Sequence, residues 1–185
     1  MQDLEERAVF KNNVSNLLAH YRDYVQARKR FLTTISLPTS CRDPLAEFSE
    51  TLVAAILDAK MAGSRVQKGY DLIRQNNRRV QVRYLCNPNQ GWINEHYIYF
   101  AEGVDDYALV IIGGLDLESV LVFPKETISQ VAKLLNKRHP KQDISIQFTQ
   151  KNYRTILAKG SDFANLGVEI YQFLDAIRLH VDMEK

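Results

Sequence analysis

The sequence lacks a strong charge of either sign, because 24 lysines and arginines stand against 22 aspartates and glutamates and leave a net charge of +2. A chain with this balance has no strong overall field, so any affinity for DNA must come from a local patch of basic residues. Only two cysteines are present, Cys41 and Cys86, and they have no metal-ligand spacing. The absence of a disulfide framework fits a reducing, cytoplasmic location.

Long apolar runs are also missing, so the sequence predicts no segment that spans a membrane. The first residues carry Asp3, Glu5 and Glu6 without an apolar stretch, which is not typical of a signal peptide. We find no internal repeat, no P-loop, no nucleotide-binding glycine fingerprint and no Ser-His-Asp order. We therefore expect no nucleotide cofactor, and the enzyme classes that depend on those motifs rank lower.

The length and composition fit one soluble globular domain. A chain of 185 residues, 45% apolar and 25% charged, is long enough for a single core, and we expect one domain over residues 1–185. Apolar residues recur every three or four positions from Asp3 to about Thr33, which predicts an N-terminal helical extension over residues 1–35. Pro38 and Pro44 mark a linker after it.

The rest of the chain predicts a mixed α/β domain with a central sheet flanked by helices. Asp43-Pro44 begins a helix that is expected to run to about Met61. The apolar run 107–112 is typical of a strand buried on both faces, and residues 119–123 and 144–148 indicate further strands. Helices are expected after Pro124 and Thr149, and an apolar stripe predicts a C-terminal helix over residues 161–181 that packs in the core or in a dimer interface.

The most informative stretch is KGYDLI, residues 68–73, followed by a polar turn and by RVQVRYL, residues 79–85. Valine, isoleucine and tyrosine dominate both arms, which predicts an antiparallel hairpin. In the second arm Gln81 and Arg83 share one face, while Val80 and Val82 share the other. A two-residue loop at Asn76-Asn77 would turn the acid of the first arm away from Gln81, so a common site requires a longer loop or a bulge.

These residues resemble the PD-(D/E)xK nuclease superfamily, which includes many restriction endonucleases. The family pattern is an acid on one strand, acid-x-Lys on the next strand and often a glutamate on the preceding helix. Asp71 matches the first acid, Gln81-Val82-Arg83 stands at the acid-x-Lys position, and Glu50 matches the helical glutamate. The resemblance covers roughly residues 47–110. It implies a restriction-endonuclease-like fold and a restriction-modification nuclease, a hydrolase of phosphodiester bonds in DNA.

The resemblance also implies a metal site for Mg²⁺ or Mn²⁺, which prefer oxygen ligands. Asp71, the Gln81 side-chain oxygen and the Val82 carbonyl would bind the ion, and Glu50 would hold a bound water or a second ion. Arg83 would stabilise the charge that develops on the scissile phosphate. Lys68, just ahead of the first arm, could supply an ammonium group.

Two departures from the family pattern leave alternatives open. Gln81 removes one negative charge from the metal site, and arginine cannot lose its proton near neutral pH as a catalytic lysine can. The chain could therefore be a catalytically degraded DNA-binding or assembly protein on the same fold. It could also be an unrelated α/β protein whose hairpin has a hydrated polar face.

Basic residues near the hairpin and in a later loop are candidate contacts for double-stranded DNA. These are Arg78, Arg79, Lys137, Arg138 and Lys141. The alternative is that they only solubilise the surface. Cutting both strands of a duplex favours two-fold symmetry, so we expect a homodimer. Glu95-His96 is not interpreted as a metal site, because no second histidine follows at ligand spacing.

Overall fold

A computed structural model describes residues 19–20, 22–38, 44–63, 69–87, 96–113, 116–137 and 145–173. The chain divides into two units, Met1–Pro44 and Leu45–Lys185. In the first unit residues 22–34 are helical, in agreement with the described part of the helix that the sequence predicts. Ser36 follows with a positive φ of 57°, a conformation that commonly ends helices.

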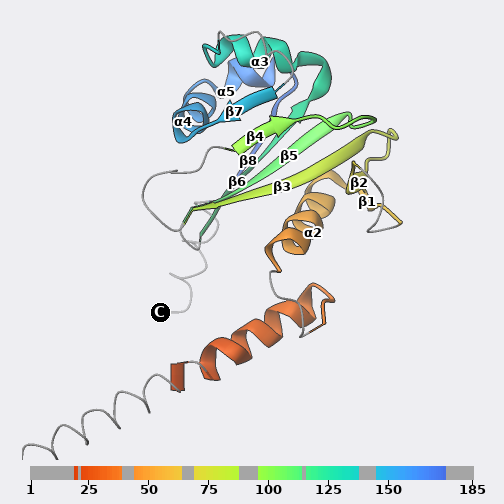
Figure 1. Cartoon of the computed structure of the whole chain (residues 1–185), viewed down its shortest axis with the longest axis vertical. Helices are drawn as coiled ribbons and strands as arrows, with labels where there is room; N and C mark the ends of the chain where they lie inside the picture. The colour runs from red at the N-terminus through yellow and green to blue at the C-terminus, as the bar shows by residue number, and fades with distance from the viewer. Residues whose placement is uncertain are drawn as a thin grey trace, which may run out of the picture. The chain divides into compact units, whose positions relative to one another are not determined.

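The second unit contains both helices and strands, labelled here as in Figure 1. The helical elements are α2 (Leu45–Leu57), the 3₁₀ helix η1 (Lys125–Thr127), α3 (Ile128–Leu134), α4 (Gln150–Ala158) and α5 (Gly160–Ala164). The strands are β1 (Lys60–Met61), β2 (Leu72–Ile73), β3 (Arg79–Asn87), β4 (His96–Tyr99), β5 (Asp106–Gly113), β6 (Asp116–Pro124), β7 (Ser145–Phe148) and β8 (Glu169–Gln172). None of the helices in the described residues is long and apolar enough to cross a lipid bilayer.

Six strands form the central sheet in the order β1-β2-β3-β5-β6-β8. β3 and β5 are parallel, and the other neighbouring strands are antiparallel, so the sheet is mixed. β4 and β7 pair separately as a two-stranded antiparallel sheet. β5 lies at the centre and is buried from Asp106 to Ile112, which confirms the strand expected from the apolar run. The predicted mixed α/β class is confirmed.

Helices lie over both faces of the central sheet (Figure 1), and a hydrophobic core lies on each face. On one face α2 packs against β3 and β5. On the opposite face lie the β4–β7 pair and α3, α4 and α5, and the buried side chains there include Ile98, Leu109, Leu121, Val131, Phe148, Ile156 and Phe163. The sheet is therefore covered on both faces, as the sequence predicts.

Helix α2 ends four residues before the predicted end at Met61. Asp58 adopts a positive φ of 48°, and the Ala59 N–H donates to the Ala54 carbonyl over 2.9 Å, which closes the helix. The chain then turns back, and Lys60–Met61 pairs with β2 as the short strand β1. The tertiary pairing of these two residues thus overrides the local preference for helix.

The predicted helix over residues 161–181 is wrong within the described residues. The chain is helical only as far as Ala164, and Gly167 then adopts a φ of 79°, which is favourable for glycine and not for other residues. Glu169–Gln172 continues as β8, which pairs antiparallel with β6. This pairing satisfies the backbone groups of the β6 edge, a long-range effect that local apolar spacing does not report. Residues after 173 lie outside the described part.

Candidate functional site

The hairpin between β2 and β3 closes through a three-residue loop. The Arg74 N–H donates to the Arg78 carbonyl over 2.9 Å, so residues 75–77 form the loop. Asn77 closes it with a φ of 61°, the left-handed conformation that asparagine tolerates. The loop is therefore longer than Asn76-Asn77, as a common site for the two arms requires.

Asp71 is held immediately before β2 by its backbone and by its side chain. Its N–H donates to the Val80 carbonyl, and its carbonyl accepts from the Ala62 N–H, each over 2.8 Å. Its carboxylate accepts the Val82 N–H over 2.7 Å, where a paired strand would offer a carbonyl oxygen. Gly69, with a φ of 107°, sets the chain direction just ahead of it. The acid is therefore fixed against the backbone of β3.

The side chains of β3 alternate between the two faces of the sheet, as the sequence predicts. Val80 and Val82 are buried in the core that includes α2. Gln81 and Arg83 point to the other face, where Gln81 is 8% exposed and the Arg83 side chain is 47% exposed. The buried amide of Gln81 and the long, half-exposed side chain of Arg83 therefore lie next to each other at the protein surface.

The guanidinium of Arg83 contacts oxygen atoms of three motif residues. Arg83 Nη1 lies 2.7 Å from the Val82 carbonyl oxygen and 3.5 Å from Oδ2 of Asp71. With the Gln81 amide oriented by its neighbours, Oε1 accepts from Arg83 Nη2 over 2.7 Å. We refer to Asp71, Gln81, Val82 and Arg83 as the hairpin cluster. Its three oxygen atoms converge on one cation.

The oxygen atoms of the hairpin cluster fit a hard divalent ion. Mg²⁺ is commonly bound through one or two carboxylates together with waters and substrate phosphates. The cluster offers one carboxylate, one amide oxygen and one carbonyl oxygen. No group of three or more histidine, cysteine, aspartate or glutamate side chains that could hold a metal occurs in the described residues. Since the Arg83 guanidinium contacts the same oxygens, an ion could take them only after this side chain turns away.

Strand β4 brings His96 close to the hairpin cluster, a contact that the sequence does not indicate. His96 Nε2 lies 2.7 Å from the hydroxyl of Tyr107, which is the register partner of Gln81 on β5. Burial, followed by the nearby positive charge of Arg83, lowers the pKa of His96, and burial raises the pKa of Tyr107. Both side chains are therefore neutral at neutral pH. His96 and Tyr107 come together because β4 and β5 lie close in the fold, so residue spacing in the sequence alone could not reveal their contact.

Glu50, which the sequence groups with the motif residues, is half-buried on α2. This helix packs against the face of β3 opposite to Gln81 and Arg83. The packing therefore separates the helix from those two side chains, and the geometry adds nothing to the predicted role of Glu50. Lys68 lies outside the described residues, so its predicted role is likewise only a prediction.

Arg78 is engaged in ion pairs within the protein, in contrast to the DNA contact expected for it. Its Nε and Nη2 donate to Asp106 over 2.9 and 2.6 Å, and Nη1 and Nη2 donate to Glu126 over 2.8 and 2.9 Å. These hydrogen bonds hold the pKa of the Glu126 carboxyl below its usual value. Arg74 lies 3.6 Å from Asp106 and pairs with Glu169 over 2.7 Å. This arrangement favours a structural role for Arg78.

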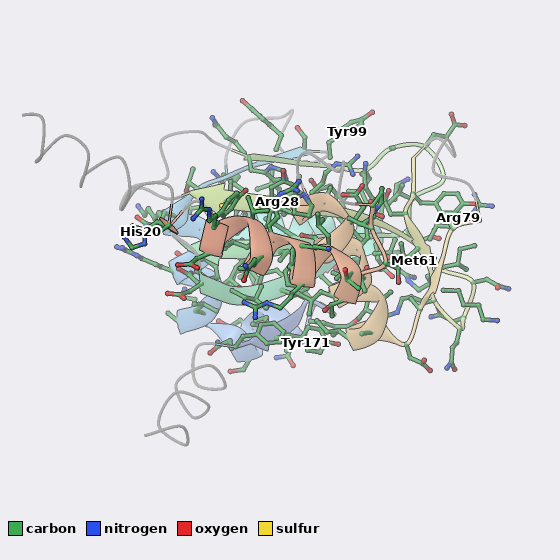
Figure 2. All side chains as sticks on the ribbon, turned by 90° about the horizontal axis from the view of Figure 1, so that it is seen from below. His20, Arg28, Met61, Arg79, Tyr99 and Tyr171 are labelled. Atoms are coloured by element: carbon green, nitrogen blue, oxygen red, sulfur yellow. The ribbon has the colours of Figure 1, made fainter. Side chains whose placement is uncertain are left out.

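The other candidate DNA contacts differ in their surroundings. Arg79 is exposed, and its guanidinium lies 5.2 Å from the centre of the Tyr70 ring, which leaves its charge at the surface (Figure 2). The Lys137 N–H donates to the Ala132 carbonyl over 2.9 Å at the end of α3. Arg138 and Lys141 lie outside the described residues. Arg79 is thus the candidate contact that the structure places nearest to the hairpin cluster along β3.

The candidate site rests on its geometry and on the sequence pattern. No family model matches the chain, and no curated protein matches its sequence.

Proposed function

We propose that the second unit is a restriction-endonuclease-like domain that hydrolyses phosphodiester bonds in DNA with Mg²⁺ or Mn²⁺ at the hairpin cluster. The observation that supports this is the convergence of the Asp71, Gln81 and Val82 oxygens on the Arg83 guanidinium. A phosphodiester site needs oxygen ligands for a cation and a cationic donor for the phosphate on the same face of the sheet. The three-residue hairpin loop supports the proposal, because it sets the Asp71 carboxylate 3.5 Å from the Arg83 guanidinium.

In this proposal each residue of the hairpin cluster has one role. Asp71, the Gln81 oxygen and the Val82 carbonyl hold the ion, which when bound lowers the pKa of a water and neutralises charge on the phosphate. Arg83 turns from Asp71 to the phosphate and donates two parallel hydrogen bonds. Because arginine keeps its proton near neutral pH, Arg83 stabilises charge and does not act as a general base.

The proposed substrate is double-stranded DNA, and the proposed active form is a homodimer in the cytoplasm. Besides Arg83, we propose Arg79 as a contact to the DNA backbone, because its side chain is exposed at the start of β3. Binding that depends on phosphate contacts should weaken steeply as salt rises.

The proposed function is tested by incubating the full chain with supercoiled plasmid DNA. We expect nicked or linear product with Mg²⁺ or Mn²⁺ and none with EDTA. Absence of any product over a range of metal concentrations and sequences would contradict the nuclease proposal.

A second candidate is a DNA-binding protein on the same fold without catalysis. It is favoured by the hydrogen bonds of Arg83, which already satisfy the oxygens that an ion would need. In that case the guanidinium takes the place of the ion, and the protein binds DNA with equal affinity whether Mn²⁺ or EDTA is present. The nuclease proposal instead expects Mn²⁺ to strengthen the binding of DNA.

Replacing Arg83 with alanine should change metal binding and DNA binding in opposite directions. The substitution removes a positive charge that contacts the metal ligands, so we expect Mn²⁺ affinity without DNA to rise roughly tenfold. It also removes one phosphate contact, which should lower DNA affinity and reduce the slope of log affinity against log salt by about one. Calorimetry with Mn²⁺ and salt-dependent anisotropy measure the two effects. Unchanged Mn²⁺ affinity would contradict the competition between Arg83 and the ion.

A further inference from the structure

Two tyrosines of β4 are exposed next to the hairpin cluster. The described residues of the second unit include three exposed large hydrophobic side chains, Met61, Tyr97 and Tyr99. Tyr97 is 59% exposed and Tyr99 is 57% exposed, whereas Ile98 between them is fully buried. Residues two apart on a strand share a face, so both rings lie on the outer face of β4. Figure 2 shows Tyr99 at the margin of the molecule.

The tyrosine backbone lies beside Gln81 of the hairpin cluster, at the edge of β4 that is not paired with β7. The Tyr99 carbonyl accepts from Nε2 of Gln81 over 3.2 Å, and the Tyr97 carbonyl accepts from the Tyr107 hydroxyl over 3.4 Å. The other edge of β4 is paired with β7. Two separate hydrogen bonds therefore fix the tyrosine backbone beside the amide that contacts Arg83.

We propose that Tyr97 and Tyr99 form a stacking platform for unpaired nucleotides of a DNA strand whose phosphate lies at Arg83. This inference rests on the proposed function, and it narrows the double-stranded substrate to duplexes that present an unpaired segment beside the scissile bond. Exposed aromatic rings next to a cationic phosphate contact are the two parts from which single-strand binding surfaces are built. We refer to the two rings as the tyrosine platform.

The spacing of the tyrosine platform favours unpaired bases over duplex DNA. Residues two positions apart on a β-strand, such as Tyr97 and Tyr99, lie about 7 Å apart. Successive bases along one strand of a DNA duplex lie about 3.4 Å apart and cover each other's faces. Bases that stack on both rings must therefore be separated from their neighbours. The register partner of Tyr97 on β7 is Gln147, whose amide can hydrogen-bond to a base edge.

The test is fluorescence anisotropy in EDTA, where no cleavage occurs, with a blunt duplex and the same duplex carrying a single-stranded tail. The proteins are the wild type, the double variant Tyr97→Ala with Tyr99→Ala, and the double variant Tyr97→Phe with Tyr99→Phe. Met61→Ala serves as a control, because it removes an exposed hydrophobic side chain from β1, which belongs to the central sheet and does not pair with β4 or β7.

We expect the wild type to bind the tailed duplex more tightly than the blunt duplex. The alanine pair should lose about 10-fold or more of its affinity for the tailed duplex, and its affinity for the blunt duplex should stay the same. The phenylalanine pair and Met61→Ala should bind both DNAs as the wild type does, because stacking needs the ring and not the hydroxyl.

Three results would overturn the platform: no preference of the wild type for the tailed duplex, equal losses on both DNAs, or no loss in the alanine pair. Failure of the proposed function looks different. If the wild type cuts no DNA but the alanine pair loses affinity for the tailed duplex only, the tyrosine platform is supported and the nuclease proposal fails. If cleavage depends on Asp71 but the alanine pair binds normally, the nuclease proposal stands and the platform fails.

Discussion

Arg78→Ala should lower the free energy of unfolding by about 3 kcal/mol, because it leaves the Asp106 carboxylate without its main partner. The Asp106 side chain is 3% exposed and receives two hydrogen bonds from Arg78. Arg74, 3.6 Å away, can compensate in part, so we expect the lower end of the range for broken buried pairs. The melting temperature should fall by roughly 6 to 12 °C.

Arg79→Ala is the matched control for this stability measurement. It removes the side chain of the neighbouring arginine, whose guanidinium lies 5.2 Å from the centre of the Tyr70 ring. We expect a loss below about 1 kcal/mol. Urea titrations of the two variants measure both values, and equal losses would show that the Arg78 ion pairs contribute nothing beyond an exposed arginine.

Asp71→Asn should reduce the rate of metal-dependent DNA cleavage by about 100-fold or more. Asp71 provides the single carboxylate of the hairpin cluster, and metal catalysis is worth several kcal/mol of transition-state stabilisation. Asparagine keeps an oxygen that can accept the Val82 N–H, so the bond that holds residue 71 against β3 can persist. The loss should therefore appear in catalysis and not in folding, which a urea titration of the variant verifies.

Asp162→Asn is the control for the change in charge. Asp162 is exposed on α5, so this substitution removes one negative charge at a place away from β2 and β3. We expect it to cut DNA at the wild-type rate. Initial rates of plasmid nicking measure both variants, and equal rates for Asp71→Asn and the wild type would remove Asp71 from the site.

Much of the hairpin was predictable because its signals are local. The alternation of Val80, Gln81, Val82 and Arg83 fixes which side chains share a face, and the parity of the loop decides whether Asp71 can join them. The apolar run of β5 likewise indicates a buried strand without knowledge of its neighbours. These features depend on residues close together in the chain.

The features that the sequence did not reveal depend on distant partners. Arg78 looks like a surface cation, but its carboxylates come from positions 28 and 48 residues away. Helical spacing relates Phe163, Leu166 and Ile170. Ile170 nevertheless packs against the core from the strand β8, because the backbone of this strand pairs with the edge of β6. The contact of His96 with Tyr107 likewise joins two separate strands. Periodicity and spacing carry no information about such contacts.

The proposed function requires that the hairpin cluster hold a divalent ion and a phosphate together. The most direct measurement is a crystal structure of the full chain with Mn²⁺ and a tailed duplex that contains an uncleavable phosphorothioate linkage, with the ion located by its anomalous signal. The proposed site predicts a Mn²⁺ peak coordinated by Asp71, the Gln81 side-chain oxygen and the Val82 carbonyl, with the Arg83 guanidinium on the phosphate. DNA bound with no Mn²⁺ at this place and Arg83 still paired with Asp71 would contradict it.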